Sequence, residues 1–220
     1  MPSSTVENYI KHIYIEQQSS PDYFVPMGSL AKSMNVVPGT ATTMIKALAD
    51  SGLVDYAPRT GVRLTAGGEK LALHVLRRHR LVELFLVKML GLDWSEVHGE
   101  AEELEHAISD KVLEKIDALL GYPKSDPHGD PIPTAEGKVK RQRLVRLSDC
   151  ETGLPVKVTR ILDQNPRFLN YAKVHGLIPG QTVVVASRDV EADALKVRKG
   201  RSSTTLGAAA ASKILVAAGR

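Results

Sequence analysis

The stretch from His79 to His106, HRLVELFLVKMLGLDWSEVHGEAEELEH, decides how the rest of the chain is interpreted. It contains six candidate ligands among its carboxylates and imidazoles, namely His79, Glu83, His98, Glu102, Glu105 and His106. Glu, Ala and Leu favour helix, so Glu102, Glu105 and His106 should project from one helix face. His79 and Glu83 are four residues apart, as Glu102 and His106 are, and lie one helix earlier. Facing helices with such side chains bind divalent metals in helical bundles, but a solvated acidic face explains the same spacing.

The composition is typical of a globular protein large enough for two domains. The chain has 220 residues, of which 43% are hydrophobic and 25% charged. No apolar run approaches the roughly 20 residues of a membrane span, and no secretion signal is recognisable. The single cysteine, Cys150, excludes a disulfide framework and a cysteine-based zinc site. We therefore expect a cytoplasmic protein without a membrane partner.

Charge is distributed unevenly along the chain. Residues 75–121 carry six basic and ten acidic side chains, whereas residues 122–220 carry seventeen basic and nine acidic ones. An acidic middle segment attracts cations. The overall net charge of +4 and the pI of about 9.1 permit nucleic-acid binding without demonstrating it.

The N-terminal part predicts a helix-turn-helix. An apolar stripe predicts a helix over 5–17, capped by Ser3 or Ser4. A short helix over 27–34, capped by Ser29, and a second helix over 40–50 follow. The second helix is the expected recognition helix. Candidate DNA contacts at its start and along it are Val37, Pro38, Gly39, Thr40, Thr42, Thr43 and Lys46. A plain pair of antiparallel helices is the alternative.

A predicted hairpin turns this pattern into a winged helix. Strands over 53–57 and 62–65 flank the turn 58–61. Arg59 and Arg63 on this wing are expected to face phosphate.

Three further helices and a linker follow. Thr65 should cap a long helix that runs to about Leu90, Ser95 should begin the acidic helix, and Ser109 should cap a helix over 111–120. Residues 121–137 are rich in proline and glycine and predict an extended linker, with His128 facing solvent.

The C-terminal part changes to short strands, over 156–161, 182–186 and 194–198 and at the C-terminus, as in a small SH3-like barrel. The predicted fold is mainly α with a small β part. It comprises a winged helix-turn-helix domain (1–73), a helical domain with the candidate metal ligands and the Pro/Gly linker (74–137) and an SH3-like β-barrel domain (138–220).

Four motifs in this order carry a family resemblance. They are His79–Glu83, Val97–Ala101, Glu102–His106 with Ile108–Asp110, and His128–Pro133. Over essentially the whole chain, the sequence resembles the diphtheria-toxin-repressor family of metal-dependent transcriptional repressors. The resemblance implies a homodimer that binds a palindromic double-stranded operator when loaded with a divalent metal, and so controls metal homeostasis. It implies as well that the second domain (74–137) is a metal-binding and dimerisation domain and that the third (138–220) is FeoA-like.

The resemblance also implies the metal ligands. The position of Glu102 is a cysteine in the iron branch and a glutamate in the manganese branch, and a carboxylate suits Mn(II). Glu102, Glu105 and His106 match the manganese-type site, and His79 matches a ligand of either branch. Glu83 and His98 match the second site of the iron branch.

The first helix departs from the family pattern. Asn8 stands where the family has a ligand, often Asp or Met, and is expected to add one neutral ligand. Lys11 replaces a glutamate of the manganese branch. The match fails near 163–168, so no ligand is assigned there. We expect Mn(II) as cofactor, with Fe(II) as the alternative.

Two other functions compete with this one. A metal-independent winged-helix regulator with a decayed metal site fits the changes at Asn8 and Lys11. A metalloenzyme is disfavoured because no His-Glu-x-x-His motif, nucleophile elbow or phosphate loop accompanies the cluster. The prediction is a transcriptional regulator that is not an enzyme.

Overall fold

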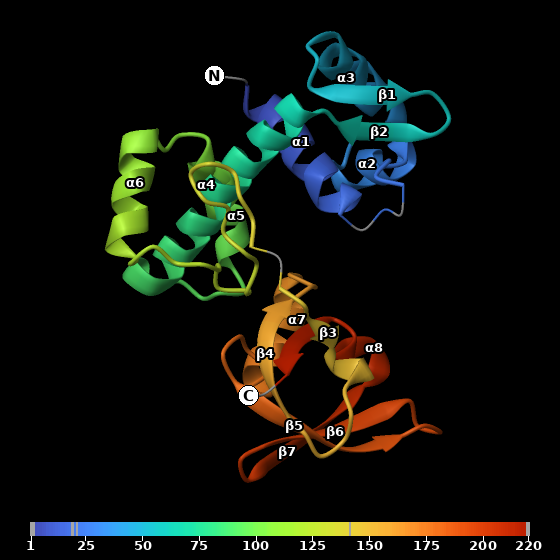
Figure 1. Cartoon of the computed structure of the whole chain (residues 1–220), viewed down its shortest axis with the longest axis vertical. Helices are drawn as coiled ribbons and strands as arrows, with labels where there is room; N and C mark the ends of the chain where they lie inside the picture. The colour runs from blue at the N-terminus through green and yellow to red at the C-terminus, as the bar shows by residue number, and fades with distance from the viewer. Residues whose placement is uncertain (1–2, 19, 21, 141, 219–220) are drawn as a thin grey trace. The chain divides into compact units, whose positions relative to one another are not determined.

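The computed structural model describes residues 3–18, 20, 22–140 and 142–218. Two compact units are present, residues 1–79 with 133–138 and residues 80–132 with 139–220, and their boundary lies inside helix α4. The helices (Figure 1) are α1 (Ser4–Gln17), α2 (Met27–Ser33), α3 (Pro38–Asp50), α4 (Ala66–Leu90), α5 (Val97–Glu105), α6 (Asp110–Leu119), α7 (Pro166–Val174), α8 (Ala208–Ala211) and the 3-10 helix η1 (Leu147–Asp149). The strands are β1 (Val54–Ala57), β2 (Gly61–Leu64), β3 (Val145–Arg146), β4 (Pro155–Ile161), β5 (Thr182–Asp189), β6 (Ala194–Lys199), β7 (Ser202–Gly207) and β8 (Ile214–Ala218).

The first unit is a winged helix. The Ser3 hydroxyl accepts a hydrogen bond from the Val6 amide and caps α1. Helices α1–α3 and the antiparallel hairpin β1–β2 enclose one apolar core, in which Ile10, Ile13 and Ile45 are fully buried. The predicted helix-turn-helix with its wing is therefore present.

Helix α2 begins at Met27 as predicted but its predicted cap is wrong, and α3 begins two residues earlier than predicted. Helix α2 has Pro26 at its N-cap without a side-chain cap, and the Ser29 hydroxyl instead donates to the Glu16 carboxylate at 2.5 Å. Helix α3 begins at Pro38 because proline suits the first helical position, where no amide donor is needed.

The wing is held by a close backbone approach at Gly61. The φ of Gly61 is +140°, and a Cβ built there would lie 2.3 Å from the Val25 carbonyl oxygen. Val25 and Val62 exchange two backbone hydrogen bonds beside this glycine. Only glycine fits this position.

The second unit begins with a helical part built on α4. Leu81 and Leu84 pack against α6, and Val82 and Leu86 pack against α5. Ser109 caps α6 as predicted. Helix α5 begins at Val97 rather than at Ser95, because the Ser95 amide and hydroxyl both donate to the Asp93 carboxylate.

The segment after α6 is not a solvated linker. Asp126, His128, Asp130 and Ile132 are all buried. The expectation that His128 faces solvent is therefore wrong. Irregular backbone is stable in a buried position only when its polar groups are paired.

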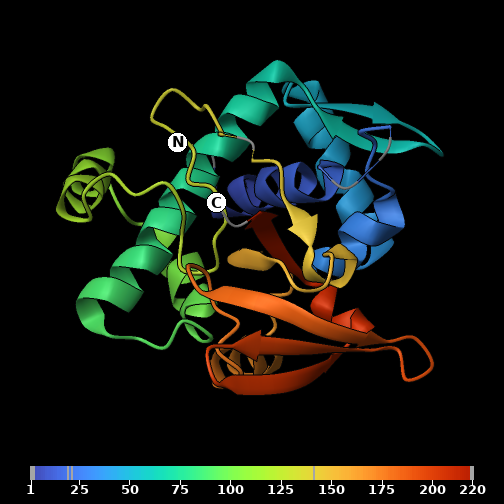
Figure 2. The ribbon, with the colours of Figure 1, turned by 60° about the horizontal axis from the view of Figure 1, so that its bottom comes forward.

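The C-terminal part is one six-stranded antiparallel sheet in the order β3-β8-β4-β5-β6-β7. The sheet is curved (Figure 2), and its buried core includes Val158, Val185, Leu206 and the free Cys150. Strands β3 and β7 are the edges, and within the described residues no ladder joins them. The expected closed barrel is thus an open sheet.

Several C-terminal elements were not predicted, among them β7 and α7. Strand β7 is hydroxyl-rich and pairs with β6 along its whole length. Helix α7 follows an Asn165 side-chain cap and has Pro166 at its first position. No helix in the described part of the chain is long and apolar enough to cross a membrane.

Candidate metal centre

Three groups of side chains within the described residues bring ligand atoms to within 4.8 Å of one another. The groups are His79–Glu83–His98, His79–Glu102–Glu105 and Glu83–Asp126–His128. His79 and Glu83 take part in two groups each and lie one turn apart on α4. The carboxylate and imidazole donors suit a hard or borderline divalent cation.

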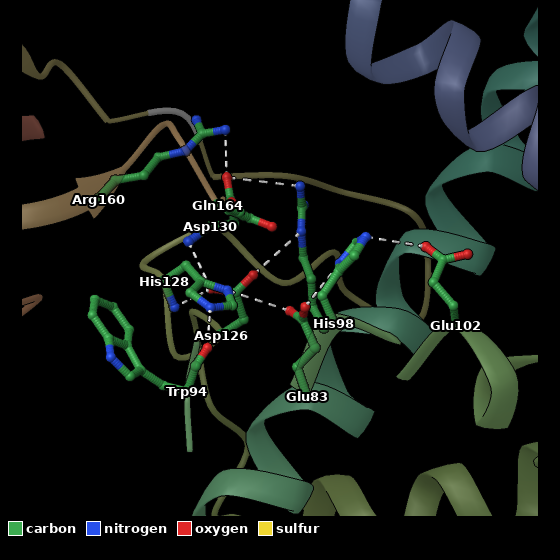
Figure 3. Close-up of polar contacts among 10 residues, drawn as sticks. Glu83, Trp94, His98, Glu102, Asp126, His128, Asp130, Arg160 and Gln164 are labelled. Carbon is green, nitrogen blue, oxygen red and sulfur yellow. Dashed lines mark hydrogen bonds and ion pairs between the residues drawn. The ribbon is translucent and has the colours of Figure 1, made fainter. Parts of the chain in front are cut away.

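Glu83 is the centre of the contacts in the second unit (Figure 3). Its carboxylate is 1% exposed, and its Oε1 lies 3.4 Å from His98 Nδ1. The Nε2 of the same half-exposed His98 lies 3.6 Å from Glu102 Oε1. Helices α4 and α5 therefore hold a chain of alternating carboxylates and imidazole.

The other predicted ligands differ in their surroundings. Glu105 is fully buried on α5, and its Oε1 lies 3.4 Å from Nε2 of His106, the residue directly after the helix. Within the described part of the chain, His106 is in none of the three groups. Asn8 lies on α1 in the first unit and is half-buried.

His128 is the site residue that sequence reasoning missed. Its side chain is 0% exposed, and its Nε2 lies 2.7 Å from the Trp94 carbonyl oxygen. A carbonyl oxygen only accepts, so Nε2 carries a proton and donates. In the neutral ring, Nδ1 then presents a lone pair 3.7 Å from Glu83 Oε2, and no hydrogen-bond partner for Nδ1 is found in the described structure. An imidazole nitrogen and a carboxylate are ligand types that divalent cations prefer, so these residues fit a metal.

Asp126 places the loop around His128. Its Oδ1 accepts from the backbone amides of His128 at 2.8 Å and Asp130 at 2.9 Å. Its Oδ2 lies 3.7 Å from Arg80 Nε. This turn of Asp, Pro, His and Gly has no helical or strand period, so periodicity could not find it. Its motif, His128–Pro133, was the available signal.

The electrostatics of this loop reflect an excess of buried carboxylates. Burial, with the neighbouring charges of Asp130 and Glu83, raises the pKa of Asp126 to about 7. Burial favours the neutral form of His128, but the Glu83 and Asp126 carboxylates outweigh it and raise the His128 pKa to about 9. The group therefore retains protons near neutral pH that a bound cation would displace.

The expected DNA-contacting residues lie on the surface of the winged helix. Val37, Pro38, Gly39, Thr40, Thr43 and Lys46 are exposed, and Thr42 is half-buried. The hydroxyls of Thr42 and Thr43 donate to carbonyl oxygens one turn earlier in α3. Arg59 is exposed in the wing turn with φ +72°. The exposed Arg63 Nε donates to Asp55 at 3.0 Å.

Comparison with known proteins identifies the family. The iron-dependent repressor N-terminal DNA-binding domain matches residues 1–62, the iron-dependent repressor metal-binding and dimerisation domain matches 65–134, and the FeoA domain matches 145–218. The iron-dependent repressor IdeR of Mycobacterium bovis is 30% identical over 194 residues, which cover 82% of this chain and 83% of IdeR. The chain belongs to the diphtheria toxin repressor family. Its relatives are transcriptional repressors, not enzymes.

The chain is also similar to solved structures of manganese-dependent members of this family. A manganese-dependent transcriptional repressor in complex with manganese is 40% identical, with a TM-score of 0.88 over 97% of this chain and 99% of that one. The manganese regulator SloR is 30% identical, with a TM-score of 0.76 over the whole of both chains. The protein is therefore a metal-dependent transcriptional repressor with a DNA-binding and a dimerisation domain. The family includes iron-dependent and manganese-dependent members.

Proposed function

We propose that this repressor is activated by Mn(II) and that the metal-loaded homodimer binds a palindromic operator. The observation that carries the proposal is the donor set, since every ligand group in the described structure consists of carboxylates and imidazoles. The one thiol, Cys150, lies in the core of the C-terminal sheet. Oxygen-rich sites suit Mn(II), and Fe(II) is the second candidate. The likeness to a repressor solved with manganese favours Mn(II).

Two ligand sets are proposed. The first ligand set consists of Glu102, Glu105, His106 and Asn8, with His79 as a further ligand. The second is centred on Glu83, with His98 and the Asp126–His128 loop as its partners. The Nδ1 of His128 supports the second set because it has no hydrogen-bond partner within the described residues and lies 3.7 Å from the Glu83 carboxylate. A bound divalent cation would add positive charge to this group of carboxylates.

The proposed switch follows from the repulsion between the carboxylates. Without a cation, the negative charges of Glu102 and Glu105 repel each other. With a cation, Asn8 joins the carboxylates, which fixes the first helix. We infer that this sets the two recognition helices of the dimer about 34–36 Å apart, one DNA turn. Coupling of about 1–3 kcal/mol is enough for a switch in operator affinity.

We further propose the functional division 1–73, 74–137 and 138–220, with DNA contacts from the start of α3 and from the wing. The C-terminal part is proposed to be an SH3-like barrel opened between β3 and β7. Register shifts in β4 and β5 support this, because bulges bend strands as small barrels require.

The test is operator binding measured by fluorescence anisotropy on DNA selected from random sequence. Binding is measured with a chelator and then with Mn(II), Fe(II), Co(II) or Zn(II). We expect tight binding with Mn(II) and weak binding with the chelator. Binding that ignores the chelator would instead identify a metal-independent regulator, and preferential activation by Fe(II) would reassign the metal.

A further inference from the structure

The loop that carries His128 is held by the C-terminal domain. Ile161, at the end of β4, donates its amide to the His128 carbonyl oxygen at 2.9 Å. Gln164 Nε2 donates to Asp130 Oδ2 at 2.6 Å, and the Arg160 guanidinium forms an ion pair with the same carboxylate (Figure 3). The candidate ligands of this loop therefore depend on β4 as well as on the helices.

The fit between loop and strand is close. Gly129 has φ +90°, and a Cβ built on it would lie 1.9 Å from the Thr159 carbonyl oxygen. The pairing of β4 with β8 shifts register between Val158 and Arg160, directly at this contact. A bulge re-aims the side chains beside it, and here Arg160 reaches Asp130.

The position of Asp126 depends on that of Asp130, because two hydrogen bonds join the two residues. The Asp130 amide donates to Asp126 Oδ1, and the Asp126 amide donates to the Asp130 carbonyl oxygen at 3.0 Å. Arg80 lies near both carboxylates, 3.7 Å from Asp126 Oδ2 and 3.9 Å from Asp130 Oδ1. Arg160 supplies a second cation. Without it, the two buried carboxylates would share Arg80, and their mutual repulsion would distort the loop.

We propose that Arg160 and Gln164 are positioning residues of the metal centre. By fixing Asp130 they hold Asp126 and His128 against Glu83, so that cation binding and docking of the C-terminal domain stabilise each other. The coupling is reciprocal, as linkage requires. The inference rests on the proposed function for the Glu83–Asp126–His128 group, and it makes neither Arg160 nor Gln164 a ligand.

The chain contains its own reporter for this contact. Trp94 is the only tryptophan of the chain. Its carbonyl oxygen accepts from His128, its ring stacks on the His128 ring at 5.5 Å, and it packs in the C-terminal core. Its fluorescence therefore responds to a change on either side of the contact.

The test compares Mn(II) affinity in variants of the full chain by calorimetry and Trp94 fluorescence. Arg160→Met and Gln164→Leu should each weaken one class of Mn(II) site about tenfold, the lower end of the loss seen when residues that orient metal ligands are replaced. Arg167→Met is the matched control, because Arg167 is an exposed arginine of α7 in the same domain. It should leave the affinity unchanged.

A double-mutant cycle separates positioning from a general loss of stability. In an Asp130→Asn background, Arg160→Met should cost little further affinity if it acts through Asp130. The inference would be overturned if the affinity losses of Arg160→Met and Asp130→Asn added fully in the double variant. It would also be overturned if Arg160→Met and Gln164→Leu both bound Mn(II) with unchanged affinity. Glu83→Gln tests the proposed group itself. If Glu83→Gln binds Mn(II) like the parent protein, the proposed Glu83–Asp126–His128 group is wrong. If Glu83→Gln weakens Mn(II) binding but Arg160→Met and Gln164→Leu do not, the group stands and only the positioning role of Arg160 and Gln164 is wrong.

Discussion

Gly129→Ala is the sharpest test of the packing between the metal-ligand loop and β4. The added Cβ would lie 1.9 Å from the Thr159 carbonyl oxygen and 2.8 Å from the Arg160 Cα, so the backbones must separate. A non-glycine residue at φ +90° costs about 1–2 kcal/mol. Separation also removes the hydrogen bond between Ile161 and His128, worth about 0.5–1.5 kcal/mol. Together these predict a loss of about 1.5–3.5 kcal/mol in the free energy of unfolding.

Gly153→Ala is the matched control. Gly153 has φ +87°, but a Cβ built there meets nothing within 4 Å. It should therefore cost only the backbone strain, about 1–2 kcal/mol. Urea unfolding followed by Trp94 fluorescence measures both losses, and Mn(II) titration should show weaker binding only for Gly129→Ala. Equal losses in the two variants, with Mn(II) affinity unchanged in both, would refute the close packing.

Three further predictions concern the metal and the DNA. Glu102→Cys should shift the order of activating metals toward Fe(II), Co(II) and Zn(II) in operator titrations, because a thiolate is a softer donor; an unchanged order would contradict the role of Glu102. Mn(II) affinity should rise as pH increases through about 7 to 9, since Asp126 and His128 must lose protons to the solvent. Calorimetry in buffers of different ionisation enthalpy would detect this release, and a pH-independent affinity without proton release would argue against it. Arg59→Ala should weaken binding to all DNA sequences and reduce the salt slope by about one, more than Arg63→Ala does.

Much of the fold could be predicted from the sequence because its helices carry their own periodic signal. Helices α1 and α6 combine apolar stripes with the serine caps Ser3 and Ser109, and α4 begins at the Thr65 cap. The same rule failed at Ser29 and Ser95. Their hydroxyls have better acceptors in the carboxylates of the folded protein, and a local pattern does not contain those partners.

The candidate site could likewise be predicted only in part. The spacing of His79 and Glu83 is helical and is recognisable in the sequence alone. The burial of His128 is not, because a loop of prolines and glycines has no period and gains its order from β4, which lies far along the chain. The predicted closure of the C-terminal sheet was wrong, because closure depends on the register of the edge strands, which the sequence pattern does not contain.

Burial of the single thiol has a consequence for redox chemistry. Reactive cysteines are exposed and have a lowered pKa, since the thiolate is the form that oxidants attack. Cys150 is buried, donates to the Arg146 carbonyl oxygen, and has its pKa raised by burial and by the Asp149 charge. A thiol in this state stays protonated and shielded from peroxide. An oxidant that reaches the folded repressor therefore finds no reactive sulfur among its candidate ligands, and oxidation of cysteine offers no direct route to switching it off.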